Sequence, residues 1–111
     1  MADVKEYRQI VQKLIEEIHS YSSNNNEVEE EIVFDRDRDR YLLIDLGWHQ
    51  KEYIYGTIVH LDIKDGKIWI QQNNTEINLA ERLIENGVPK EHIVIGLHSP
   101  FMRQFSGYAV S

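Results

Sequence analysis

The first apolar pattern along the chain has the spacing of an amphipathic helix. Apolar side chains recur at steps of three and four residues, which places them on one helical face: Val4, Tyr7, Ile10, Val11, Leu14, Ile15, Ile18 and Tyr21. Charged and amide side chains fill the opposite face. The Ser/Asn-rich stretch 22–26 disfavours continuation of the helix. The pattern therefore predicts a helix over residues 3–21, followed by a loop.

The middle of the chain carries patterns that are typical of β-strands. Four β-rich segments alternate with charged or polar turns: 28–34, 41–48, 53–63 and 68–70. The dipeptide Asp65-Gly66 lies between the last two segments and is a strong hairpin signal. We therefore expect a meander of about four antiparallel strands, each near the common strand length.

A second helix is expected after the sheet. Thr75 or Asn74 is placed to cap a helix that starts near Glu76. Gly87 follows the last helical residues, where a left-handed backbone favours glycine. The short apolar run 93–97 is then either a last strand or a buried connector.

Together these elements predict an α+β fold. Its parts are a long N-terminal helix packed on a mostly antiparallel sheet of about four to five strands, and a second helix before a short C-terminal strand or segment. A meander cannot bury its inner face alone, and the first helix offers the largest apolar stripe to cover it. No repeat or long linker divides the 111 residues, so we expect a single domain over residues 1–111.

Composition limits the classes of function. The chain has no cysteine, which excludes disulfides, thiolate nucleophiles and Cys-based zinc sites. No apolar run approaches the roughly 20 residues of a membrane span, and no signal-peptide pattern occurs, so a cytoplasmic location without membrane contact is expected. The formal net charge is −7 and no basic block is present. Because DNA binding relies on cations placed against phosphates, direct nucleic-acid binding is disfavoured.

Side chains that could form a metal or catalytic site are scattered along the chain. On a strand, His60 and Asp62 share a face and could reach one ion, with His98 as a third ligand. Isolated ligand residues are more often ordinary surface side chains, and no zinc-protease, serine-hydrolase or phosphate-loop motif occurs. We therefore expect no catalytic set, cofactor or metal. A small metal-dependent hydrolase that uses these three residues is kept as an alternative.

The C-terminal segment has the composition of an interface. Aromatic, Met and Arg residues are enriched in interface cores, and five such residues form a candidate partner interface: Phe101, Met102, Arg103, Phe105 and Tyr108. The same residue types also close domain cores, so the sequence leaves both roles open. Exposed aromatic side chains on a small sheet are also compatible with a homodimer or tetramer.

Motifs spread over nearly the whole chain form a family pattern. They include Tyr7-Arg8-Gln9-Ile10, Phe34-Asp35, Asp39-Arg40-Tyr41, Gly47-Trp48, Tyr55-Gly56, Thr75-Glu76-Ile77, a dense block from His60 to Gln71, and residues 98–110. This pattern closely resembles the XisI family, the fdxN-element excision controlling factors, and the block 60–71 is its most specific part. Ser99 stands where a second proline is common in the family, which affects only local loop geometry.

The resemblance implies an accessory role in the programmed excision of a DNA element, in which a separate recombinase cuts and rejoins the DNA. It also implies a protein partner, an XisH-like protein that resembles the restriction-endonuclease-like nucleases. It brings no catalytic residues with it. The expected function is therefore that of a non-catalytic accessory that binds an XisH-like partner. The alternative within the same setting is an excision factor that binds DNA directly.

Overall fold

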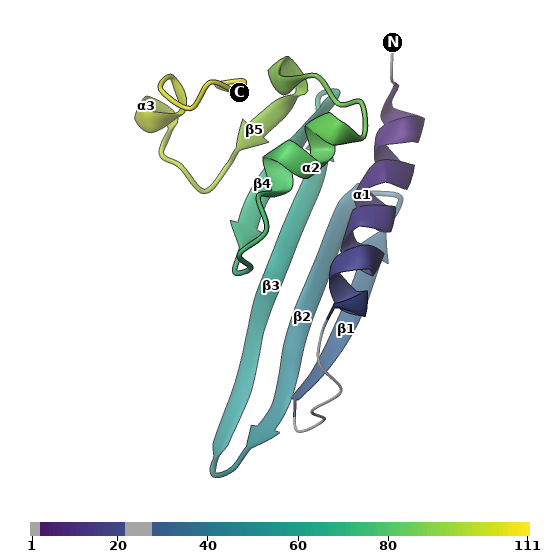
Figure 1. Cartoon of the computed structure of the whole chain (residues 1–111), viewed down its shortest axis with the longest axis vertical. Coiled ribbons are helices and arrows are strands. Elements are labelled where there is room, and N and C mark those ends of the chain that lie inside the picture. The colour runs from purple at the N-terminus through teal and green to yellow at the C-terminus, as the bar shows by residue number, and fades with distance from the viewer. Residues whose placement is uncertain (1–2, 22–27) are drawn as a thin grey trace.

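A five-stranded sheet with helices α1 and α2 over one of its faces makes up most of the molecule (Figure 1). A computed structural model describes residues 3–21 and 28–111. The elements in chain order are α1 (Val4–Ser20), β1 (Val28–Asp35), β2 (Arg40–His49), β3 (Glu52–Lys64), β4 (Lys67–Asn73), α2 (Leu79–Glu85), the 3-10 helix η1 (Lys90–His92), β5 (Ile93–Ile95) and α3 (Pro100–Arg103). The predicted α+β fold is confirmed. The loop predicted over 22–26 lies outside the described residues.

The sheet has the strand order β1-β2-β3-β4-β5. Its first four strands form the predicted antiparallel meander, and β5 adds in parallel to β4. The expected common strand length is wrong for β2 and β3, which have 10 and 13 residues. Asp65 and Gly66 have φ angles of 54° and 75°, as a tight hairpin turn requires. The apolar run 93–97 thus begins as a last strand, which the sequence had left open.

The core lies between α1, α2 and one face of the sheet. The apolar face of α1 buries Tyr7, Val11, Leu14, Ile15 and Ile18. On the sheet, Tyr41 and Leu61 are both fully buried, and they lie directly opposite each other on β2 and β3. Asp3 caps α1 by accepting a 3.0 Å hydrogen bond from the Glu6 N–H. Helix periodicity predicted these buried residues, but Tyr21, which it placed on the same face, is 57% exposed at the end of the helix.

The second helix begins at Leu79, three residues after its predicted start near Glu76. The Asn73 side chain accepts hydrogen bonds from the N–H and the hydroxyl of Thr75, at 2.9 and 2.6 Å. The Thr75 hydroxyl oxygen in turn accepts from the Ile77 N–H at 3.1 Å. These local bonds hold a turn that competes with helix formation, so a later asparagine supplies the cap. The predicted cap at Thr75 or Asn74 is therefore wrong.

Strands β2 and β3 form a long hairpin that extends beyond α1 and β4 (Figure 1). Pairing with β4 covers β3 only from Val59 to Lys64. We call residues 44–57, at the far end of this hairpin, the distal arm. Its Trp48 and Tyr53 rings lie 5.2 Å apart and are 62% and 50% exposed. Within the described ranges 3–21 and 28–111, no helix is long and apolar enough to cross a membrane.

Candidate functional site

The C-terminal segment forms a short helix, α3, and two exposed aromatic side chains lie on and just after it. Ser99 starts the helix, because its hydroxyl accepts a 3.3 Å hydrogen bond from the Met102 N–H and Pro100 occupies the first helical position. The Phe101 and Phe105 rings pack edge to face with centroids 5.6 Å apart. These rings are 67% and 66% exposed, so the pair is not part of the core.

Arg103 turns in the opposite direction and holds α3 against the sheet. Its Nε donates to the His98 carbonyl at 3.1 Å, and its Nη2 donates to the Gly96 carbonyl at 3.3 Å. The guanidinium also lies 5.1 Å from the centre of the Trp69 ring, which Lys64 approaches at 4.3 Å. Arg103, which is half-buried, therefore anchors the helix through its guanidinium.

The chain then returns along the edge of the sheet. Gly107, with φ of 83°, redirects the backbone, and the Ala109 N–H donates to the Ile93 carbonyl at 2.9 Å. Tyr108 is partly buried and packs against the hydrophobic core. The five residues of the predicted interface thus divide in two. Phe101, Met102 and Phe105 are exposed, whereas Arg103 and Tyr108 face inward.

A surface of exposed apolar side chains results at this end of the molecule. It consists of Leu97, Phe101, Met102 and Phe105, which we call the C-terminal apolar cluster; each is at least half exposed. A groove of about 360 Å³ lies within it. Large apolar side chains that gather on a surface are typical of binding sites.

Two of the three candidate metal ligands come together on β3. His60 Nε2 lies 2.8 Å from Asp62 Oδ1, and Gln71 Nε2 donates to the other oxygen of Asp62 at 3.3 Å. His98 instead lines the groove of the C-terminal apolar cluster. In the part of the chain that the structure describes, no three His, Cys, Asp or Glu side chains are placed to hold a metal ion.

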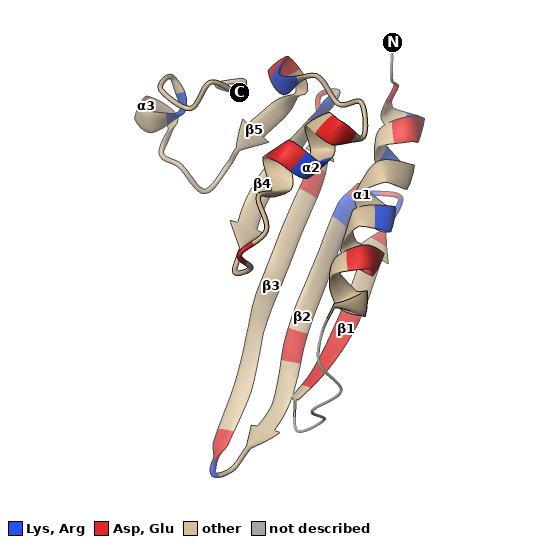
Figure 2. Ribbon diagram, in the orientation of Figure 1, with Lys and Arg blue, Asp and Glu red and all other residues tan. Residues whose placement is uncertain are grey.

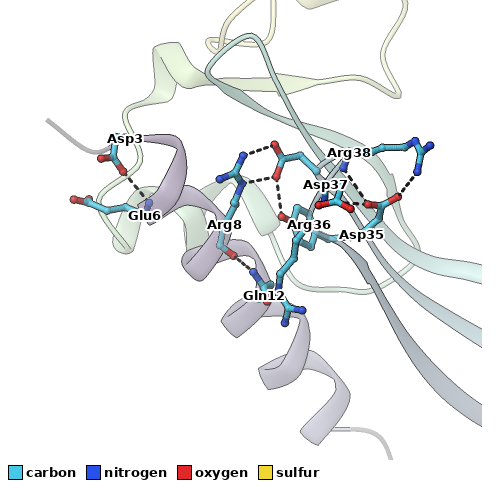
Figure 3. Close-up of polar contacts among 10 residues, drawn as sticks. Asp3, Glu6, Arg8, Gln12, Asp35, Arg36, Asp37 and Arg38 are labelled. Atoms are coloured by element: carbon cyan, nitrogen blue, oxygen red, sulfur yellow. Dashed lines mark hydrogen bonds and ion pairs between the residues drawn. The ribbon is translucent and has the colours of Figure 1, made fainter.

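A polar network fastens α1 to the turn between β1 and β2 (Figure 3). Arg8 donates from Nε and Nη2 to the two oxygens of Asp39, at 2.6 and 3.1 Å, and the Tyr41 hydroxyl donates to Asp39 at 2.9 Å. The hydrogen bonds from Arg8 are the main cause that lowers the pKa of Asp39. Burial is the main cause that raises the pKa of the Tyr41 hydroxyl to about 12, and its hydrogen bond to Asp39 is the second cause. Because Tyr41 is fully buried, this network stabilises the fold.

A second groove, of about 450 Å³, lies beside β3 in the distal arm, where no site was predicted from the sequence. Its floor includes Asp45 and Gly56, which lie directly opposite each other on β2 and β3. Partial burial, followed by the charge of Glu30, raises the pKa of Asp45. The available signal in the sequence was Gly56, because glycine inside a strand often marks a place where another backbone approaches.

Fold and surfaces together define the class of protein: a small α+β domain with one helix-covered sheet face and exposed apolar and acidic surfaces. The family model described as XisI protein matches residues 1–110, so the chain belongs to the XisI family. The expected family resemblance is thereby confirmed. No curated protein matches the chain.

Two solved structures resemble the chain over nearly its full length. An XisI-like protein from Anabaena variabilis ATCC 29413 is 42% identical, with a TM-score of 0.91, and the match covers 96% of this chain and 97% of that one. The fdxN element excision controlling factor XisI from the same organism is 29% identical, with a TM-score of 0.87 and the same two coverages. These likenesses extend from the first helix to the C-terminal segment that carries the apolar cluster.

Proposed function

We propose that this chain is a non-catalytic accessory factor in the excision of a DNA element, and that it acts by binding a partner protein with an XisH-like nuclease fold. Membership of the XisI family supports the setting, as does the likeness to a protein described as an fdxN element excision controlling factor. In this role the DNA is cut and rejoined by other proteins. The chain controls them by contact.

The observation that carries the proposal is the C-terminal apolar cluster. Phe101 and Phe105 are two-thirds exposed, yet Arg103 fixes the backbone that bears them. Interface hot spots are enriched in aromatic side chains. A surface that is already ordered loses less conformational freedom when a partner binds. The cluster therefore has both the residue types and the rigidity that favour a protein partner.

The charge of the chain supports a partner with a basic face. The formal net charge is −7, and exposed carboxylates such as Glu29 and Glu31 line the outer strand β1 (Figure 2). Nucleases bind DNA with basic surfaces, and complementary charge speeds the encounter of two proteins and fixes their orientation. An acidic accessory can thus cover the DNA-binding face of its partner and compete with DNA for it.

Co-expression of the chain with an XisH-like protein, followed by co-purification and titration calorimetry, tests the proposal. The wild-type chain is expected to form a complex, and the double variant Phe101→Ala/Phe105→Ala is expected to bind about tenfold or more weakly, since truncated hot spots commonly cost above about 1.4 kcal/mol. Ile84→Ala, which truncates an exposed apolar residue on α2, is the matched control and should bind like wild type. Absence of a wild-type complex at micromolar concentration would refute the proposal.

A DNA titration with the chain alone separates this proposal from direct DNA binding. The expected result is no specific retention of the element's DNA by the chain without its partner. A direct DNA-binding factor would instead show tight binding that weakens steeply as salt rises, because released counterions dominate such affinity.

A further inference from the structure

One edge of β3 lacks a neighbouring strand along the distal arm. Strand β4 pairs with β3 only up to the pair Val59 and Asn73. The Asn74 N–H and side chain then close this end, donating to the Ile58 and Thr57 carbonyls at 2.8 and 3.1 Å. Among the described residues, no strand lies beside positions 52–56 on that side (Figure 1). An unpaired strand edge is a template for a further strand.

The 450 Å³ groove lies along this open edge, on the face of the sheet that α1 covers farther up. Glu30, Asp45 and Gly56 form one row across β1, β2 and β3. His19, near the end of α1, contacts Glu30 at 2.7 Å, so the row lies just beyond the helix. A Cβ atom built on Gly56 would meet nothing within 4 Å. The missing side chain of Gly56 therefore leaves the groove open toward Asp45.

The groove is acidic: the described residues that line it include Glu30 and Asp45 and no Lys or Arg, and His19 of α1 contacts Glu30. Neither 41–50 nor 52–63 contains Lys or Arg, and Figure 2 shows blue only at the tip of the hairpin and at its upper end. The Asp45 carboxylate is partly buried close to the carboxylate of Glu30. A cation placed between them would offset both their burial and their mutual repulsion.

On the opposite face of the same strand the side chains are aromatic. Because side chains alternate along a strand, Tyr53 and Tyr55 lie on the face of the sheet opposite Gly56, and they are 50% and 69% exposed; Tyr55 also borders the groove. A strand added beside β3 would therefore meet acidic side chains on one face and aromatic side chains on the other.

We propose that the open edge of β3 binds an extended segment of a partner protein by strand addition, in which basic residues alternate with apolar ones. The backbone of the segment pairs with residues 52–56, a Lys or Arg enters the groove toward Asp45 and Glu30, and its apolar residues contact Tyr53 and Tyr55. The inference rests on the proposed function, namely that the chain works by binding a partner. A second copy of this chain is disfavoured as occupant, since pairing two such edges brings acidic grooves together.

Synthetic peptides probe the edge without knowledge of the partner. The test peptide has ten residues, Lys alternating with Val, and carries a fluorescent label. One control peptide replaces Lys with Glu, and another groups the same Lys and Val residues into two blocks. Anisotropy should show saturable binding of the alternating peptide only, and the amide NMR shifts should move at residues 52–58. Equal binding of the blocked peptide, or shifts confined to residues outside 52–58 and outside the groove around Asp45 and Glu30, would overturn the proposal.

Two variants locate the contact, and one matched variant controls for bulk charge. Gly56→Val fills the groove in a conformation that suits a strand, and Asp45→Asn removes one charge with little change of shape; each is expected to weaken peptide binding about tenfold. Glu29→Gln removes the same charge from the opposite face of the neighbouring strand β1 and should change affinity less than about twofold. Equal losses of peptide affinity for Asp45→Asn and Glu29→Gln would show that only the net charge of the chain matters, which would overturn the proposed site.

The full partner separates failure of this inference from failure of the proposed function. If the XisH-like protein binds the Gly56→Val variant as tightly as the wild-type chain, the open edge of β3 is not its docking site. The proposal that the chain binds a partner would then still hold. If the wild-type chain binds the alternating peptide but not the XisH-like protein, the proposed function is refuted, whereas strand addition at the edge of β3 is supported. Sedimentation that shows a wild-type dimer, lost in Gly56→Val, would make a second copy the occupant and overturn the proposal.

Discussion

The two halves of the β2–β3 hairpin have similar residue types and opposite surroundings. Near α1, the side chains of Tyr41, Leu43 and Leu61 are fully buried. In the distal arm, Trp48 and Tyr55 are 62% and 69% exposed. Aromatic and branched residues suit a pleated strand in both halves, so the neighbouring elements decide the exposure. Helix α1 covers the face that carries Tyr41, Leu43 and Leu61, whereas Trp48 and Tyr55 lie on the opposite face, in the part of the hairpin beyond the β4 pairing. The comparison teaches that the covered half stabilises the fold, while the uncovered half is left available for contacts.

The largest difference is expected from truncations in the two halves. Leu43→Ala removes a fully buried side chain and should lower the free energy of unfolding by about 2–5 kcal/mol. Tyr55→Ala removes a larger but exposed side chain and should cost less than about 1 kcal/mol. Urea unfolding followed by circular dichroism measures both. Similar losses would show that the distal arm is part of the stabilising core, which contradicts the comparison.

The second-largest effect on the free energy of unfolding is expected from the hydrogen-bond network around Asp39. Asp39→Asn keeps a residue that tolerates the observed φ of 57° but weakens the contacts to Arg8 and Tyr41, so a loss of about 1–3 kcal/mol is expected. Asp37→Asn, at an exposed position in the same turn, should stay within about 0.5 kcal/mol. Equal stability of the two variants in urea titrations would show that the network does not fasten α1.

The same network predicts loss of stability at both ends of the pH scale. The folded-state pKa of Asp39 is lowered, so its contribution is present above the unfolded pKa near 4 and is lost as pH falls through the folded pKa. The pKa of Tyr41 is raised from 10.0 to about 12, so its contribution is present below pH 10 and is lost as pH rises through about 12. Urea midpoints across pH measure this, and Tyr41→Phe should flatten the alkaline loss. An unchanged alkaline slope in Tyr41→Phe would assign the loss to other groups.

The smallest effect on global stability is expected at the C-terminal end. Arg103→Ala removes hydrogen bonds to two carbonyls and a contact with Trp69, yet it should cost only about 1 kcal/mol because the main core is untouched. Amide exchange over residues 97–106 should nevertheless accelerate. Gln104→Ala, at an exposed neighbouring position, serves as control. Unchanged exchange in Arg103→Ala would show that α3 is held by other contacts.

Features fixed by local chemistry were predictable from the sequence. The apolar stripe of α1 and the Asp65-Gly66 turn were both read correctly. Gly87 ends α2 with φ of 98°, and the Val88 N–H reaches the Leu83 carbonyl at 3.0 Å, as a glycine cap requires. In each case the relevant contacts lie within a few residues along the chain.

Features fixed by distant contacts were not predictable. The row of Asp45 and Gly56 depends on the β2–β3 register, which shifts at a bulge beside Ile44, and no sequence pattern marks that shift. Arg103 has the residue type of an interface, yet two carbonyls and Trp69 turn it inward. The later start of α2 followed from a side-chain bond of Asn73 that competes with the helix. Contacts between segments decided the first two features, whereas the start of α2 was decided by a local side-chain bond that competes with a cap.

Hydrogen–deuterium exchange on the chain with and without an XisH-like partner reports on the covered and the uncovered regions in one experiment. The account predicts that the partner slows amide exchange in the C-terminal apolar cluster, over residues 97–105, and along the open edge at 52–56. Amides of α1 should exchange at the same rate in both samples. Protection confined to α1 and α2, or no protection at saturating partner, would contradict the account.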